Sequence, residues 1–301
     1  VRLVNCKING TTQQNESKVV NKSELQKKET LITISKSYLL ILNCEISAIN
    51  TVSHIGPIMI DATENCFIQV QNSHFKNNTG SYGLMYIKNN SKLDIINSIF
   101  IENKAIAVEK VGGGCIKLEQ NVTVTINNST FISNSASCGG VIGVNGSRFL
   151  NIHSSIFKQN QANNFTVVNE TTGGVINVYE GNIEINVAQS VFEQNTADAG
   201  GCIFIRTGHS ALNINHSHFI NNSAAKTCGA LQLFKVTGTI KFSHFEGNMA
   251  SQSCGTLSAN KSTLIVIKSE FKNNKGHGCI GAIETIDHTK AIIINCSFVN
   301  N

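Results

Sequence analysis

The chain of 301 residues contains no tryptophan and a single proline, Pro57. Charged residues make up only 14% of it, whereas they make up roughly a quarter of an average soluble domain. The formal net charge is +5, but the basic residues are scattered, and the densest stretch, 22–28, also contains Glu24. Nucleic acid binding requires a clustered basic stripe with stacking aromatics, so this class of function is disfavoured.

Long hydrophobic runs are missing as well. The longest, Tyr38–Leu42 and Ala291–Ile294, are far shorter than the roughly 20 residues of a transmembrane helix, so no membrane span is expected. The chain has no initiator methionine and no signal peptide, and it begins and ends inside the repeats described below. We therefore expect a processed chain or a fragment of a longer one.

Asparagine, in contrast, is abundant, with 39 residues. Nine of them end a repeated motif, Phe-x-x-Asn. The phenylalanines of the motif are Phe75, Phe100, Phe131, Phe157, Phe192, Phe219, Phe245, Phe271 and Phe298, and the asparagines are Asn78, Asn103, Asn134, Asn160, Asn195, Asn222, Asn248, Asn274 and Asn301. The base period is about 26 residues, which indicates a repeat architecture.

The residues around each phenylalanine predict three short strands per repeat. Branched aliphatics lie five and usually seven residues before it, and serine lies two residues before eight of the nine. Side chains of a strand alternate between its faces, so these two pairs cannot share one straight strand, and the chain must turn between them. A third strand opens with glycine, as in Gly140-Val141-Ile142 and Gly174-Val175-Ile176.

Three strands, no helix and this period predict an all-β fold, a right-handed parallel β-helix of about ten coils. In such a fold the phenylalanines form an internal column and the asparagines form a ladder of hydrogen-bonded amides. We expect one domain, 1–301, with degenerate coils and a polar loop (9–30) in 1–64 and regular repeats in 65–301. The alternative, a β-propeller or sandwich, is disfavoured because a propeller blade needs roughly 40 residues.

The pairing of Phe-x-x-Asn with Gly-Gly-[Ala/Val/Cys]-[Ile/Leu] resembles the repeat of the polymorphic outer membrane proteins, within the right-handed β-helix (pectin-lyase-like) superfamily. The closest matches to the glycine motif begin at Gly139, Gly173 and Gly200. The resemblance covers about residues 65–301 and implies a β-helical surface protein with adhesive or structural roles. The many glycosylation sequons depart from this bacterial family and favour a eukaryotic extracellular relative.

Ten cysteines suggest disulfides between stacked coils, because equivalent positions of neighbouring coils lie within bonding range. The hypothesis pairs Cys6 with Cys44, Cys115 with Cys138, Cys202 with Cys228 and Cys254 with Cys279, and it leaves Cys66 and Cys296 unpaired. Pairing of Cys228 with Cys254 is an alternative, and buried free thiols are another. No Cys-x-x-Cys is present and histidines do not cluster with cysteines, so no metal site is expected.

Asn-x-Ser/Thr sequons are also frequent, and with the cysteines they favour a secreted or cell-surface glycoprotein that carries N-linked glycans. The sequon asparagines are Asn9, Asn15, Asn21, Asn77, Asn89, Asn121, Asn127, Asn128, Asn145, Asn164, Asn169, Asn215, Asn221, Asn260 and Asn295. An Asn- and Ser-rich chain also produces some sequons by chance.

Catalytic chemistry is not indicated. Glycoside hydrolysis needs paired carboxylates and calcium-assisted lyases need several acidic ligands, but the four aspartates fall in different repeats. His74, His218 and His244 precede phenylalanines and should face outward; His218 and His244 should be stacked neighbours, and exposed strand histidines are the simpler interpretation.

We therefore expect no cofactor and a non-enzymatic extracellular structural rod that associates head to tail or with other extracellular matrix or surface proteins. One alternative is an adhesin that binds a receptor or glycan through the insertions around 105–112 and 161–172. The other is a polysaccharide lyase or glycosidase.

Overall fold

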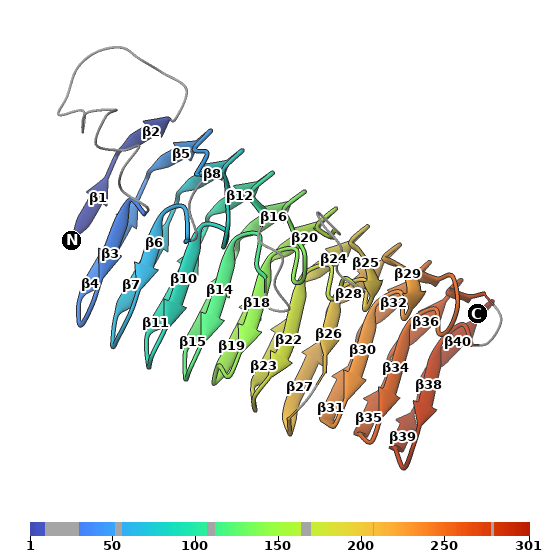
Figure 1. The fold of residues 1–301 in the computed structure, drawn as a ribbon. Helices are drawn as coiled ribbons and strands as arrows, with labels where there is room; N and C mark the ends of the chain where they lie inside the picture. Colours follow the sequence, from blue (N-terminus) through green and yellow to red (C-terminus); the bar gives the residue numbers. More distant parts are fainter. Residues whose placement is uncertain (10–29, 52–55, 107–111, 164–169, 207, 278–279) are drawn as a thin grey trace.

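The computed structural model describes residues 1–9, 30–51, 56–106, 112–163, 170–206, 208–277 and 280–301. They form an all-β parallel solenoid of about nine turns with a period near 27 residues, which confirms the parallel β-helix expected from the repeat. The rod runs from β1 to β40, with the two chain ends at opposite ends (Figure 1). Among the described residues there is no helix long and apolar enough to cross a membrane.

A complete coil contributes one strand to each of four sheets, which we name C, A, B and D in chain order; the coils at the two ends lack some of these strands. Sheet A consists of β1 (Arg2–Val4), β4 (Tyr38–Leu42), β7 (Phe67–Gln71), β11 (Lys92–Ile96), β15 (Thr123–Asn127), β19 (Phe149–His153), β23 (Glu184–Ala188), β27 (Ser210–Asn215), β31 (Val236–Lys241), β35 (Thr263–Ile267) and β39 (Lys290–Ile294). Sheet B consists of β2 (Lys7–Asn9), β5 (Glu45–Ser47), β8 (His74–Lys76), β12 (Ile99–Ile101), β16 (Thr130–Ile132), β20 (Ile156–Lys158), β24 (Val191–Glu193), β28 (His218–Ile220), β32 (His244–Glu246), β36 (Glu270–Lys272) and β40 (Ser297–Val299).

Sheet C follows the glycine motif. Its strands are β3 (Ile32–Ile34), β6 (Ile60–Ala62), β10 (Met85–Lys88), β14 (Ile116–Glu119), β18 (Ile142–Asn145), β22 (Ile176–Glu180), β26 (Ile203–Ile205), β30 (Leu231–Phe234), β34 (Leu257–Asn260) and β38 (Ile283–Ile286). Sequence analysis predicted these three sheets.

A fourth sheet, D, was not predicted and corrects the expectation of three strands per coil. Its strands are β9 (Thr79–Gly80), β13 (Lys104–Ala105), β17 (Ser135–Ala136), β21 (Gln161–Ala162), β25 (Thr196–Ala199), β29 (Ser223–Thr227), β33 (Met249–Ala250) and β37 (Lys275–Gly276). Most of them hold only two residues, which is too few for an alternating pattern to be recognised.

The turn expected between the aliphatic pair and the Ser-x-Phe strand is the corner between sheets A and B. One residue in each coil adopts the left-handed conformation there, with φ between 45° and 53°. We call these residues the A–B corner column: Asn5, Asn43, Asn72, Asn97, Asn128, Ser154, Gln189, His216, Phe242, Lys268 and Asn295. Asparagine tolerates this conformation better than most residues, which accounts for its frequency at the corner.

The glycine motif forms the corner between sheets D and C. Its first glycine is left-handed, as at Gly173 with φ +63°. Its second glycine packs against the backbone of the next coil: a Cβ on Gly174 would lie 2.1 Å from the carbonyl oxygen of Gly201. Neighbouring coils can therefore approach to hydrogen-bonding distance only because no side chain stands between them.

The final coil leaves core-type residues uncovered. Ile293 and Phe298 are 45% and 46% exposed, whereas their partners in the preceding coil, Val266 and Phe271, are 1% and 0% exposed. Ile293 and Phe298 therefore continue the core columns of the preceding coil.

Candidate functional site

The structure places the nine motif phenylalanines in one column inside the rod. Neighbouring rings lie 4.6–5.1 Å apart between centroids, with planes within 10° of parallel. Eight of the nine are completely buried, and Phe298 is the exception. Ile46 and Ile8 continue the column toward the first coil. This column is structural, because eight of its nine phenylalanine side chains do not reach the surface.

The nine motif asparagines form a second column beside it. Each Nδ2 donates to the Oδ1 of the asparagine in the following coil, at 2.7–3.0 Å. The same Nδ2 donates to a carbonyl oxygen of the preceding coil, which belongs to Ile46 for Asn78 and to a phenylalanine for the others, for example from Asn160 to Phe131 at 2.9 Å. The buried amides are thus fully hydrogen-bonded and have no capacity left for a ligand.

The hydroxyls of the serines that lie two residues before eight of the phenylalanines are also engaged in hydrogen bonds. The hydroxyl of Ser217 donates to the carbonyl oxygen of Asn215 at 2.9 Å and accepts the backbone N–H of Ser190 at 3.2 Å. Ser243 repeats this arrangement with Lys241 and Ser217. These hydroxyls, which lie beside His218 and His244 in the sequence, support the backbone and are not placed as nucleophiles.

The structure overturns the expected disulfides within the described residues. Its nine described cysteines are all free: Cys6, Cys44, Cys66, Cys115, Cys138, Cys202, Cys228, Cys254 and Cys296. The pairs 6–44, 115–138, 202–228 and the alternative 228–254 are therefore unbonded, and the pair 254–279 involves Cys279, which lies outside the described residues. Cys6 and Cys44 do lie in one column, and so do Cys228 and Cys254.

Two of these pairs fail because of register. Cys115 is hydrogen-bonded to Val141, its equivalent in the next coil, whereas Cys138 precedes Val141 by three residues. Cys202 is likewise equivalent to Ala230, two residues after Cys228. The expected pairs were chosen because each cysteine lies near a glycine motif. They therefore joined cysteines that do not occupy equivalent positions of neighbouring coils.

Burial makes the interior thiols unreactive. Desolvation raises the pKa of Cys115, Cys202 and Cys228 well above the ordinary value, and it raises the pKa of Cys254 to about 11. Because the thiolate is the reactive form, these cysteines behave as small apolar residues.

The described sequon asparagines all lie at or near the surface. Asn77, Asn121, Asn128, Asn215, Asn221 and Asn295 are exposed, while Asn9, Asn89, Asn127, Asn145 and Asn260 are partly exposed. Asn15, Asn21, Asn164 and Asn169 lie outside the described residues, as do most of the expected insertions 105–112 and 161–172. The exposed asparagines are therefore accessible to a glycosylating enzyme on the folded surface.

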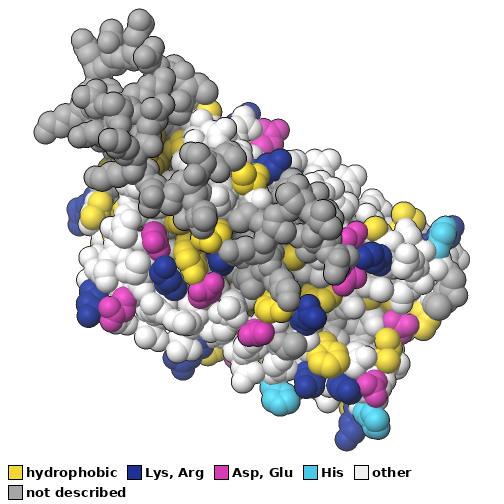
Figure 2. Space-filling view, in the orientation of Figure 1, with side chains coloured by type: hydrophobic (Ala, Val, Ile, Leu, Met, Phe, Trp, Pro, Cys, Tyr) yellow, Lys and Arg dark blue, Asp and Glu magenta, His cyan; other side chains and the backbone are white. Residues whose placement is uncertain are grey.

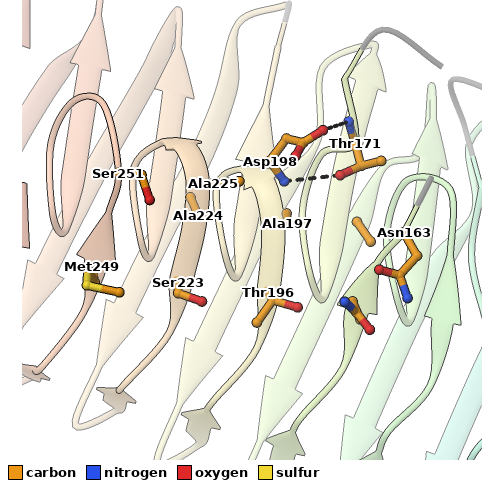
Figure 3. Close-up of a pocket in the computed structure, with 12 residues that line it drawn as sticks. Asn163, Thr171, Thr196, Ala197, Asp198, Ser223, Ala224, Ala225, Met249 and Ser251 are labelled. Carbon is orange, nitrogen blue, oxygen red and sulfur yellow. Dashed lines mark hydrogen bonds between the residues drawn. The ribbon is translucent and has the colours of Figure 1, made fainter. Parts of the chain in front are cut away.

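Two hollows mark the surface of the described residues. The first, of about 340 Å³, runs along sheet D, where Thr196, Ser223 and Met249 lie in a row on successive coils (Figure 3). Asp198 and Thr171 close one side: the Thr171 N–H donates to the Asp198 carboxylate and the Asp198 N–H donates to the Thr171 hydroxyl, both at 3.0 Å. Asp198 is the one titratable residue among those that line it.

The second hollow, of about 810 Å³, lies over sheet B and the A–B corner near the C-terminal end. We call it the Phe242 hollow, and its lining residues include His216, His218, Phe242, His244, Glu246, Lys268, Glu270 and Asn295. The phenyl ring of Phe242 stacks on the His216 ring at 4.8 Å, with an interplanar angle of 16°. The rings of His218 and His244 lie 5.8 Å apart, as stacked neighbours.

Two carboxylates hold His244 in this hollow. Its Nε2 lies 2.9 Å from Glu246 and its Nδ1 lies 3.0 Å from Glu270. Hydrogen bonds from His244 and then from Lys272, which is 3.3 Å from Glu246, lower the pKa of the Glu246 carboxyl. The sequence pattern indicated the two stacked histidines, and it placed His216 and Lys268 among the polar residues of the corner, but it did not single out Phe242. The signal that would have shown Phe242 is an aromatic residue at a corner that otherwise carries polar residues.

Charge elsewhere on the surface is mixed. Basic and acidic side chains are interspersed over the described part of the face shown in Figure 2. Among the described residues, no three His, Cys, Asp or Glu side chains gather into a group that could hold a metal ion.

Comparisons with known proteins identify no family. No protein-family model matches the chain, and no curated protein matches it either. One solved structure that it resembles is a mutant of the periplasmic alginate epimerase AlgG, at 10% identity over 89% of this chain and 78% of that chain, with a TM-score of 0.25. A likeness at this TM-score supports no conclusion about activity.

Proposed function

We propose that the protein is a non-enzymatic extracellular structural protein, a glycosylated β-helical rod that stacks head to tail into a filament. The observation that carries the proposal is the regular stack of coils, in which the phenylalanine and asparagine columns pass from each coil to the next in one register. The first coil of a second copy could continue these columns and pair with the strand edges of a preceding copy.

The registers of the two terminal coils are compatible with such stacking. Ile8 occupies the phenylalanine column in the first coil, so it would lie on Phe298 of the preceding copy. Cys6 and Cys296 occupy one position of the repeat, in the column that serine holds in the eight coils from Ser73 to Ser269. At the usual strand spacing of about 4.8 Å, a Cys6 and a Cys296 from adjacent copies would be close enough for a disulfide.

The extracellular and glycosylated character is supported by the sequons. Asn77, Asn128 and Asn221 are exposed corner residues with left-handed backbone. Glycans there would project sideways from the rod and leave its ends open. The resemblance of the repeat to that of the polymorphic outer membrane proteins favours a surface role, and membership of that family is part of the proposal.

The stacking is tested by disulfide trapping in a Cys44→Ser variant. Cys44 lies beside Cys6 and would compete for it, and serine is the residue of that column in the following coils. Oxidation with glutathione disulfide removes the two thiol hydrogens, forms the S–S bond and releases two glutathione thiols. We expect a ladder of dimers, trimers and larger species on a non-reducing gel, with a peptide that joins Cys6 to Cys296.

A Cys44→Ser, Cys296→Ser variant is the matched control and should remain a single band. A chain that stays monomeric at high concentration would overturn the stacking, and so would crosslinks that join only Cys296 to Cys296. Release of unsaturated or reducing sugar ends from polyuronates, with or without calcium, would overturn the non-enzymatic assignment. A glycosidase-sensitive mass on the protein secreted from eukaryotic cells is expected for the glycosylated form.

A further inference from the structure

Phe242 is an unusual residue for its position in the A–B corner column. The A–B corner requires left-handed backbone. Six of its eleven positions carry Asn, and two more carry Ser or Gln. Phe242 has φ +48° and its side chain is 44% exposed. A bulky residue in this conformation costs free energy. Because the ring is nearly half exposed, it gains only part of the free energy that full burial would give. The coil itself therefore does not need a phenylalanine here.

The neighbours of Phe242 make it part of a flat surface. His216, one coil earlier, stacks on the ring, and the Nζ of Lys268, one coil later, lies 5.5 Å from the ring centroid. Three successive coils thus replace small polar side chains by two rings and a lysine. The result is an aromatic platform that faces the Phe242 hollow.

Hydrogen-bonding groups border the platform on sheet B. His244 bridges the carboxylates of Glu246 and Glu270, and Lys272 binds Glu246 from the next coil. Glu246 is thereby paired with His244 and Lys272, and Glu270 with His244, so these side chains are held in place before any ligand arrives. The hollow is open to solvent, so a ligand would lie along the surface of the rod and not inside a closed pocket.

We infer that the Phe242 hollow binds a neutral oligosaccharide of pyranose units. A pyranose ring has an apolar C–H face, which an aromatic ring covers, and a hydroxyl edge, which needs both donors and acceptors. Phe242 and His216 supply the first, and the Glu246, Glu270 and Lys268 side chains supply the second. An acidic chain would meet the two carboxylates and a cationic peptide would meet Lys268 on the ring, so a ligand without charge fits best. This binding function goes beyond the structural role proposed above.

The test uses the chain with Asn295→Gln, so that a glycan on this lining residue cannot fill the hollow; Gln189 shows that the corner accepts glutamine. Isothermal titration calorimetry with cellohexaose, chitohexaose and hexagalacturonate should show binding of at least one neutral hexasaccharide. The substitution Phe242→Asn should weaken it about tenfold, the loss expected when an aromatic stacking contact is removed.

Phe242→Asn installs the usual residue of the corner, so its thermal midpoint should be unchanged or higher, and weaker binding would not reflect unfolding. Phe67→Thr is the matched control, because Phe67 also lies beside an aromatic ring, Tyr38, and a lysine, Lys92, but on sheet A. Its affinity should equal that of the parent. Binding of hexagalacturonate alone, binding of no oligosaccharide, or equal affinity in the Phe242→Asn variant would each overturn the inference.

Discussion

Each interior phenylalanine of the column packs between the ring of the preceding coil and the ring of the following coil. Phe157 lies 4.9 Å from Phe131 and 4.8 Å from Phe192 and is completely buried. We expect Phe157→Ala to lower the free energy of unfolding by about 3–5 kcal/mol, because it removes buried apolar surface and leaves a cavity. Urea denaturation measures this. Phe298→Ala, at the exposed end of the column, should cost clearly less, and an equal loss would contradict the account.

The asparagines of the neighbouring column contribute to stability mainly through hydrogen bonds. Asn160 Oδ1 accepts from the backbone and side chain of Asn134, and its Nδ2 donates to Phe131 and Asn195. Asn160→Leu keeps the branched shape of the side chain but leaves its hydrogen-bonding partners unpaired, at about 1–3 kcal/mol for each buried group.

The matched variant is Asn151→Thr. Asn151 also accepts an amide hydrogen bond, from Asn186 at 2.9 Å, but on the outer face, where water can replace it. Urea denaturation should show a much larger loss for Asn160→Leu than for Asn151→Thr. Similar losses would mean that the buried ladder contributes no more than an outer one.

The Phe242 hollow should show a pH response. The His244 hydrogen bond is the largest cause of the lowered Glu246 pKa, followed by that of Lys272, so His244→Gln should raise this pKa toward its ordinary value. A group whose pKa is lowered by folding contributes stability above its unfolded pKa, near 4.3 for glutamate, and loses it as the pH falls through the folded value. The advantage of the parent over the variant should therefore shrink in acid. Carboxyl-carbon NMR titration measures the shift directly, and identical Glu246 midpoints would refute it.

Glycine sets the contact between coils at the corner from sheet D to sheet C. A Cβ on Gly174 would meet the carbonyl oxygens of Gly201 at 2.1 Å and Thr196 at 2.7 Å. Gly174→Ala should therefore destabilise the rod by about 1–3 kcal/mol, the usual cost of overpacking, and thermal unfolding would show it. Gly146→Asn is the control, because Gly146 has open space and asparagine tolerates its φ of +75°. A Gly174→Ala variant as stable as this control would refute the packing argument.

The strands of sheets A, B and C were predictable because each holds three or more residues, and the same residue types recur at the same positions from coil to coil. Val70 and Phe75 illustrate this, since their odd spacing required the corner at Asn72. Sheet D was not predictable, because Thr79–Gly80 and similar pairs are too short to show a period. The cysteine register failed because Cys138 and Cys115 flank the same glycines at different distances. The Phe242 hollow depends on side chains from three coils, which no local pattern joins.

Removal of one complete coil should leave a folded rod. Deletion of 223–248 joins Asn222 to Met249, as Asn248 is joined to it in the parent, and places Phe219 beneath Phe271. In a solenoid each coil contacts only its neighbours, so the loss is local. Circular dichroism should show a cooperative thermal transition with β content.

Deletion of 223–235, half of that coil, is the control. It removes the D and C strands but keeps β31 and β32, so the columns cannot continue in register. This variant should fail to unfold cooperatively. Equal behaviour of the two deletions would contradict the quasi-one-dimensional description of the molecule.

The amide ladder also gives the molecule a polar axis. Its eight side-chain bonds from Asn78 to Asn301 all run in one sense, with each nitrogen directed toward the following coil and each oxygen toward the preceding one. Aligned amide dipoles add along a common direction, as they do along an α-helix. Two rods meeting by like ends would oppose these dipoles, whereas a continued column keeps them aligned. Any fibre built on this ladder would therefore have two chemically different tips, which would grow at different rates.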